Sequence, residues 1–407
     1  MPSGGRCGLS GHVYRTPLPA GKGIDVHGRR LVEIIDTLGH RWYGRAIARF
    51  GKSGWQTTLE LSGIAMHSRR FIWGVPLVLL VVGTTPLARA APPARGITKL
   101  ANQAFLNPAD KNRIHDWAQH WSDELAAGDP ATVARARAKL MEPLKAVQVG
   151  GVFRLEYAGV LLPPLQVIIG GVNPHSAFNA TQVVGVVGTD RALEILCDIA
   201  NDQSLGIRLC AAESFKTAVR QGAITPNEIS RGLRRLGKAA CQEEHWLVLR
   251  RQFEAIYSVD SDVSRDVQLK ILQRTTARMS DNPNGPSDLM RALYPALKFL
   301  RDGYIKLPRA KQGPFGKVLA PVLCRVCSVA DGHWEKAQED PEAKKIYGGA
   351  IQISETLLQV IHGRVQPDRN PPRTALDRAW REKDKPRFDR DRVKWQGILA
   401  NPPYGGN

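Results

Sequence analysis

Two cysteines with two residues between them, Cys324 and Cys327, have a spacing that is typical of chemical sites. A thiol–disulfide enzyme places such a pair at the start of a helix, where the helix dipole lowers the thiol pKa. Here the apolar run 318–323 comes first, so we expect the pair inside a helix. Ser328 follows where covalent haem attachment requires histidine, and the sequence holds no second pair to complete a zinc site. We therefore predict small core residues or a local disulfide.

Other residues that could do chemistry lack the spacing that chemistry requires. His115 and His120 are five positions apart, so on a helix they point roughly 140° from each other and make a poor metal pair. The run 243–245, Glu-Glu-His, lacks the second histidine of a metalloprotease helix. The sequence has no glycine-rich phosphate loop and no serine-nucleophile elbow. We therefore assign no catalytic, cofactor-binding or metal-binding residue.

The positive charge is spread unevenly along the 407 residues. The net charge is +19, of which +5 lies in 1–65, +3 in 66–90 and +5 in 363–407, leaving +6 for 91–362. The densest basic clusters are 231–235, with three arginines, and the tail 378–394, where acidic and basic residues alternate. Because nucleic-acid binders concentrate cations on one face, this distribution disfavours nucleic acid. It favours another protein or an anionic component of the cell envelope as the partner.

The segment 66–90 has the three-part pattern of a secretory signal. Basic residues at 67–70 precede an uncharged apolar run, 71–82, which is shorter than the roughly 20 residues that span a bilayer. Ala88 and Ala90 then stand at alternate positions before Ala91, as a signal peptidase requires. We expect cleavage after Ala90, only transient contact with the membrane, and a periplasmic or secreted bacterial protein.

The position of this signal raises a question about residues 1–65. A signal belongs at the N-terminus, so Met66 is the expected start of translation. We interpret 1–65 as a wrongly included or disordered extension; the alternative is that 71–82 forms a buried helix of an N-terminal domain. After cleavage five cysteines remain, of which Cys197 and Cys210 could meet across a helical hairpin.

The region 91–362 is predicted to be one all-helical domain. Asn107-Pro108 is a helix start, and apolar residues from Ile114 to Leu125 then recur on one face. Asp129-Pro130 starts the next helix. A third apolar stretch, 152–162, is expected to end at Pro163-Pro164; 165–172 is either a strand or a buried helix, and 173–180 a loop. Further helices are expected at 190–200, 204–219, 225–236, 241–259, 262–272, 287–300, 314–329 and 341–362.

Alternate helix starts at Asp190, Thr225 and Asp262 are 35 and 37 residues apart, near the period of paired-helix solenoids. The small and aliphatic residues of 190–193 and 204–212 resemble HEAT or armadillo repeats, mainly over 190–259. This resemblance implies an α-solenoid that binds partners on a concave surface. The alternative all-α fold is an irregular helical bundle. The proline-rich run 366–372 and the charges beyond it predict a disordered tail over 363–407.

These observations favour an exported, non-catalytic helical-repeat protein that acts as a protein-binding scaffold. One alternative is an intracellular basic adaptor that binds nucleic acid. The other is a helical enzyme whose site is assembled from scattered residues.

Overall fold

The fold is all-α. The computed structural model describes residues 96–146, 148–221, 223–282 and 287–404, and this part of the chain contains helices and no strand. The α-helices are α2 (Pro108–Ala126), α3 (Pro130–Met141), α4 (Gly151–Ile169), α5 (Pro174–Val187), α6 (Asp190–Asp198), α7 (Leu205–Arg220), α8 (Pro226–Gln242), α9 (Trp246–Tyr257), α10 (Asp262–Asp281), α11 (Met290–Lys306), α12 (Arg309–Gly332), α13 (Trp334–Glu339), α14 (Pro341–Val365), α15 (Leu376–Glu382) and α16 (Lys385–Leu399). Short 3-10 segments lie at Thr98–Leu100, Glu142–Lys145, Ile199–Asn201 and Ser287–Leu289.

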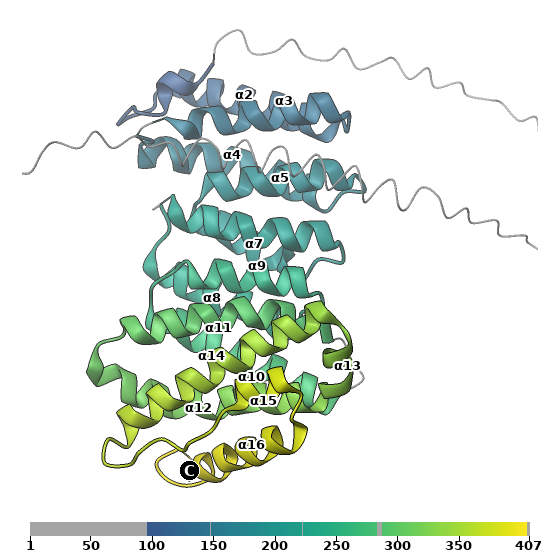
Figure 1. Ribbon diagram of the computed structural model, residues 1–407. Coiled ribbons are helices and arrows are strands. Elements are labelled where there is room, and N and C mark those ends of the chain that lie inside the picture. Colours follow the sequence, from purple (N-terminus) through teal and green to yellow (C-terminus); the bar gives the residue numbers. More distant parts are fainter. Residues whose placement is uncertain (1–95, 147, 222, 283–286, 405–407) are drawn as a thin grey trace, which may run out of the picture. The chain divides into compact units, whose positions relative to one another are not determined.

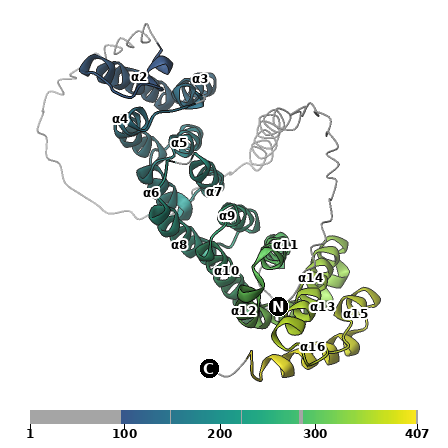
Figure 2. The same cartoon turned by 90° about the vertical axis from the view of Figure 1, so that its left-hand side faces the viewer.

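The helices stack in two layers. In one layer α2, α4, α6, α8, α10 and α12 follow one another, each packed against the next. In the other layer α3, α5, α7, α9, α11 and α14 do the same (Figures 1 and 2). A single apolar core runs between the layers, because each amphipathic helix buries its apolar face against both neighbours.

A capping residue followed by proline starts many of these helices. The Asn107 side chain accepts from the Asp110 amide at 2.9 Å, and the Asp129 side chain accepts from the Thr132 amide at 2.8 Å. Proline then occupies the first helical turn, where its missing N–H would have no partner. The same pairing recurs at Asn173-Pro174, Thr225-Pro226 and Asp340-Pro341. The predicted starts of α2, α3 and α8 are confirmed.

Residues 35 positions apart contact each other in the middle of the stack. The Thr225 amide donates to Asp190 Oδ1 at 2.9 Å, so the starts of α8 and α6 are joined. The Arg208 guanidinium donates to both carboxylate oxygens of Glu243, which is also 35 residues away. The spacing of 35 residues between the predicted helix starts at Asp190 and Thr225 is therefore also the sequence separation of residues that bond successive helix pairs to each other.

The stretch 152–172 differs from its prediction because α4 continues through Pro163 and Pro164. The carbonyls that lose a donor are those of Gly159 and Val160, four residues earlier. Gly159 is exposed and Val160 is half-buried, so this part of α4 lies at the surface of the stack, where water can replace the missing donors. The two prolines therefore do not end the helix, and the choice between strand and helix for 165–172 resolves to helix as far as Ile169.

The predicted loop at 173–180 is wrong. Asn173 is the N-cap of α5, and its side chain accepts from the amides of His175 and Ser176 at 3.0 and 3.2 Å. The single helix predicted over 241–259 is also wrong, because Glu243 and His245 separate α8 from α9. His245 caps α9 by accepting from the Leu247 amide.

The prediction of a disordered tail over 363–407 is wrong for α15 and α16. Trp380, Phe388 and Trp395 are fully buried against the end of the stack. The Trp380 indole donates to the Lys344 carbonyl at 3.0 Å, and the Trp395 indole donates to the Thr374 hydroxyl at 3.1 Å. Phe388 and Trp395 are seven positions apart and share one face of α16, whereas Trp380 lies on α15, before the break at Lys383. Through these three residues both helices join the apolar core of the stack.

Two helices, α4 and α12, are long and apolar enough to cross a membrane by length and composition alone. About half of each is buried in the stack, where both pack against neighbours in their own layer and in the other one. The predicted extension 1–65, the signal 66–90 and the cleavage residues Ala88, Ala90 and Ala91 lie outside the described residues.

Candidate functional site: an anion-binding groove between α8 and α10

A strongly basic groove of about 670 Å³ lies between α8 and α10. The two helices approach closely at Gly237, where a Cβ would overlap a methyl carbon of Val267. Gly237 and Val267 are buried, and Val263 and Cys241 beside them are half-buried. These four residues give the groove an apolar floor.

Cations stand along both sides of this floor. Arg234 and Lys238 are one helical turn apart on α8, and Lys270, Arg274 and Arg278 are one turn apart on α10. Asp266 is the only acidic residue among those lining the groove. Residues four apart on a helix share a face, so each set of cations forms a row.

Four of these cations have no carboxylate partner within the described part of the chain. Arg234, Lys238, Lys270 and Arg274 are all exposed and make no ion pair there. Arg278 is half-buried and donates to the carbonyls of residues 242 and 243 at 3.3 and 2.8 Å. The groove therefore carries uncompensated positive charge, which is the electrostatic requirement for an anion site.

The thiol of Cys241 lies within electrostatic range of three of these cations. Its thiol is half-buried and free. Burial raises the pKa of this thiol, and the positive charges of Lys270, Arg274 and Arg278 oppose that rise. Three cations of α10 therefore act on one atom at the α8 side of the groove.

Of the arginine cluster at 231–235, only Arg234 lines the groove. Arg231 pairs with Glu228 at 2.9 Å, and Arg235 pairs with Asp198. The sequence interpretation missed Lys238 and the row on α10, although their spacing of four residues was the available signal.

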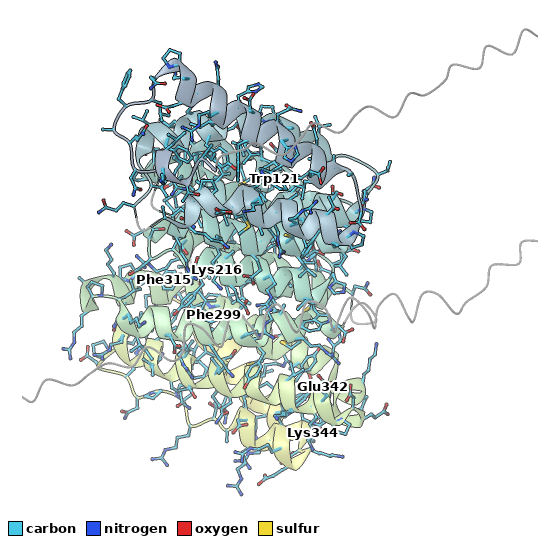
Figure 3. The ribbon with its side chains drawn as sticks, turned by 90° about the horizontal axis from the view of Figure 1, so that it is seen from above. Trp121, Lys216, Phe299, Phe315, Glu342 and Lys344 are labelled. Atoms are coloured by element: carbon cyan, nitrogen blue, oxygen red, sulfur yellow. The ribbon has the colours of Figure 1, made fainter. Side chains whose placement is uncertain are left out.

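A second hollow, of about 530 Å³, has a different character. It lies where α9 meets α10 and α11 meets α12, and the aromatic rings of Tyr257, Phe299 and Phe315 line it. Figure 3 labels Phe299 and Phe315. Tyr257 and Phe299 stack with ring centroids 4.4 Å apart. Its cations Arg265 and Lys311 are already paired with carboxylates, which leaves Lys306 as its one lining cation without an ion pair among the described residues. This hollow therefore carries less free positive charge than the groove.

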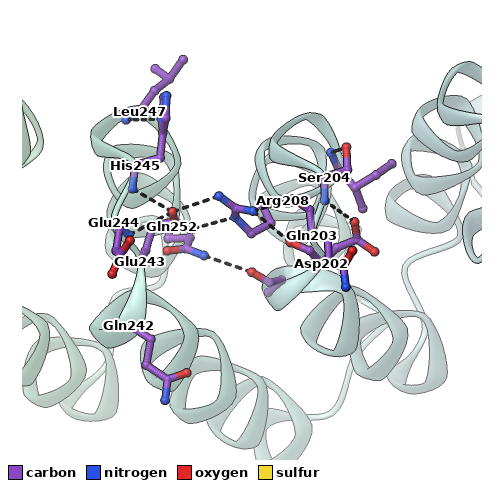
Figure 4. A network of polar contacts seen from close by, with 12 residues as sticks. Asp202, Gln203, Ser204, Arg208, Gln242, Glu243, Glu244, His245, Leu247 and Gln252 are labelled. Carbon is purple, nitrogen blue, oxygen red and sulfur yellow. Dashed lines mark hydrogen bonds and ion pairs between the residues drawn. The ribbon is translucent and has the colours of Figure 1, made fainter. Parts of the chain in front are cut away.

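The polar network next to the groove is structural. Glu243 is buried and accepts from Arg208 Nε and Nη2 at 2.8 and 3.2 Å (Figure 4). It also accepts from the amides of Glu244 and His245 at 3.1 and 2.9 Å. These bonds fix the α8–α9 turn against the start of α7.

The cysteine pair predicted from spacing lies inside α12. Cys324 and Cys327 are both buried and both free, so the structure places them as core residues without a disulfide. Burial raises the pKa of Cys324 to about 11, and it also raises the pKa of Cys327 well above the usual value of a thiol. A raised thiol pKa is opposite to what thiol–disulfide exchange needs.

Cys197 and Cys210 do not meet. The Cys197 thiol donates to the Gly232 carbonyl at 3.6 Å, and the Cys210 thiol donates to the Phe178 carbonyl at 3.4 Å. Both thiols are free, because they face different neighbouring helices. Among the described residues, no three His, Cys, Asp or Glu side chains come together as a metal site.

Comparison with protein-family models, curated proteins and solved structures finds no match to this chain.

Proposed function

We propose that this protein is an exported, non-catalytic helical scaffold that binds an anionic macromolecule in the groove between α8 and α10. One observation supports this above all: four exposed cations face one groove without carboxylate partners among the described residues. HEAT-like repeats, which the periodicity of 190–259 resembles, commonly serve as binding scaffolds.

Neighbouring like charges repel one another, and this repulsion is relieved when an anion enters between them. Elsewhere in the stack most arginines are paired, as Arg208 is with Glu243 and Arg265 with Asp262. The groove departs from this pattern, and such a departure favours a role in binding over a role in folding.

Binding is tested with the full chain and fluorescein-labelled poly-L-glutamate, measured by fluorescence anisotropy at about 50 and 300 mM salt. The variant carries Lys270→Glu and Arg274→Glu. The matched control carries Lys99→Glu and Arg220→Glu, which change the same two residue types at exposed positions outside the groove.

We expect the groove variant to weaken binding about tenfold or more, and the control variant less than about twofold. Binding should also weaken steeply at the higher salt concentration, because surface charges are screened. Equal loss in the two variants would show general attraction to a basic chain and would refute the groove as the site.

Export is tested separately by N-terminal sequencing of the protein recovered from cells. We expect the chain to begin at Ala91. Recovery of protein that still carries residues 66–90 would refute export and leave the groove proposal untouched.

A further inference from the structure

We propose that the groove between α8 and α10 receives an acidic, amphipathic α-helical segment of another protein. This inference rests on the proposed function and specifies the ligand class. The apolar stripe of the ligand helix would lie on the floor, and its carboxylates would face the two rows of cations.

The floor of the groove favours a ligand with an apolar surface. Gly237 and Val267 form its buried part, and Val263 and Cys241 are half-buried beside them. A ligand that offers only charges would leave the exposed surface of Val263 and Cys241 in water. A helix with an apolar stripe covers them, and burial of apolar area is the main favourable term in association.

The cations are spaced at the step of an α-helix. Lys270 and Arg274 are one turn apart, about 6 Å along α10, and Arg278 continues the row while it also bonds the carbonyls of residues 242 and 243. Acidic residues four apart on a ligand helix advance by the same distance, so successive carboxylates meet successive cations. Arg234 and Lys238 repeat this step on α8 and would face the opposite edge of the ligand helix.

The groove offers no main-chain hydrogen-bond partners for a ligand's backbone. The groove is lined by the interiors of α8 and α10, whose backbone groups already bond within their own helices. An extended peptide would find no strand edge there and would bury unpaired N–H and C=O groups. A helical ligand satisfies its own backbone, so only its side chains need partners.

The groove lacks the features of a phosphate-polymer site. Phosphate sites use backbone N–H groups at helix N-termini, and nucleic-acid grooves add aromatic rings for base stacking. Here Arg234 and Lys270 stand near the middle of α8 and α10, and the other cations stand closer to the C-terminal ends, so none lies at a helix N-terminus. The residues lining the groove include no aromatic side chain.

The test uses the full chain and a labelled peptide of about 18 residues, which spans roughly 27 Å as a helix. Its leucines form one stripe, and glutamates four apart flank that stripe. The control peptide has the same composition in scrambled order, so charge is constant and amphipathicity is lost. Single-stranded DNA of matched charge and inorganic polyphosphate are the two phosphate probes.

A floor variant, Val263→Ser, removes apolar surface from the groove without changing its charge. We expect the amphipathic peptide to bind about tenfold tighter than the scrambled one, and Val263→Ser to weaken it about fivefold. Binding of poly-L-glutamate should be unchanged in Val263→Ser. Circular dichroism of the variant checks that the stack is intact.

Two results would overturn the inference while leaving the groove as an anion site. One is equal binding of the amphipathic and scrambled peptides, with poly-L-glutamate binding still sensitive to Lys270→Glu and Arg274→Glu. The other is tighter, groove-dependent binding of DNA or polyphosphate. If no anionic probe depends on the groove, both the inference and the proposed function fail.

Discussion

Glu243 joins parts of the stack that are far apart in sequence, and its removal should destabilise several helices. Its carboxylate accepts two hydrogen bonds from Arg208 and two from the amides of Glu244 and His245. In Glu243→Ala all four are lost, and the Arg208 guanidinium, whose side chain is 19% exposed, keeps no ion partner.

Breaking a buried ion pair by removing one partner costs about 3–5 kcal/mol. Arg208 retains bonds to the carbonyls of Asp202 and Gln203 at 2.9 and 3.2 Å, and it keeps some contact with water. We therefore expect a cost at the lower end of this range, so the free energy of unfolding should fall by about 3 kcal/mol in Glu243→Ala.

The free energy of unfolding is measured by urea unfolding, with circular dichroism as the signal. Amide hydrogen exchange then shows which residues lose protection. Faster exchange is expected in the turns around 202–204 and 243–245. Glu244→Ala is the matched control, because Glu244 is exposed and contributes only its backbone amide to the network. That variant should change the free energy by less than about 0.5 kcal/mol.

A double-mutant cycle with Arg208→Met separates the pair from the rest of the network. We expect a coupling energy of about 2 kcal/mol, since residues in one hydrogen-bond network are not additive. A coupling energy near zero between Arg208 and Glu243 would refute a stabilising network. The same conclusion would follow if Glu243→Ala lost no more free energy of unfolding than Glu244→Ala.

Three further predictions concern packing and thiol chemistry. Trp380→Ala should lower stability by about 3–5 kcal/mol and release α15 and α16, seen as fast amide exchange over 376–399. Gly237→Ala should cost about 1 kcal/mol net in urea unfolding, because overlap with the stiff Val267 outweighs the gain in helix propensity. With a thiol reagent at about pH 8, mass mapping should show Cys241 labelled before Cys324, whose pKa is raised by burial to about 11.

Each of these has an outcome that contradicts it. Unchanged exchange over 376–399 in the Trp380 variant would show that the aromatic cluster does not hold the two helices. Gly303→Ala is the control for Gly237, because Gly303 has open space at its Cβ position and alanine there should stabilise α11 by up to about 1 kcal/mol. Early labelling of Cys327 would show that α12 opens in the native state.

Local signals in the sequence predicted most helix starts but not every helix end. Caps such as Asn107 and Thr225 act through atoms within three residues, so the sequence contains the whole signal. Pro163 was misread because its effect depends on whether water reaches the carbonyl of Gly159, and that depends on which face of α4 is exposed. Such exposure is a property of the packed stack.

The tail and the groove were missed for different reasons. In 376–399 the alternating charges suggested disorder, although Phe388 and Trp395 already have a helical spacing of seven and Trp380 adds a third large aromatic residue to bury. The groove required knowledge that α8 and α10 are neighbours, which brings Lys238 and Lys270 together across 32 positions of sequence. Only the stacking order supplies that knowledge.

The position of Glu243 also affects how the stack would respond to mechanical force. Its carboxylate is held from one side by Arg208, and its carbonyl is held from the other by Arg278 at 2.8 Å. Three consecutive helix pairs thus share one residue as a common anchor. When the stack is pulled along its axis, residues 208–278 should unfold in one step. The force curve should then show one large unfolding event for these three helix pairs, whereas repeats that unfold independently would give three smaller events.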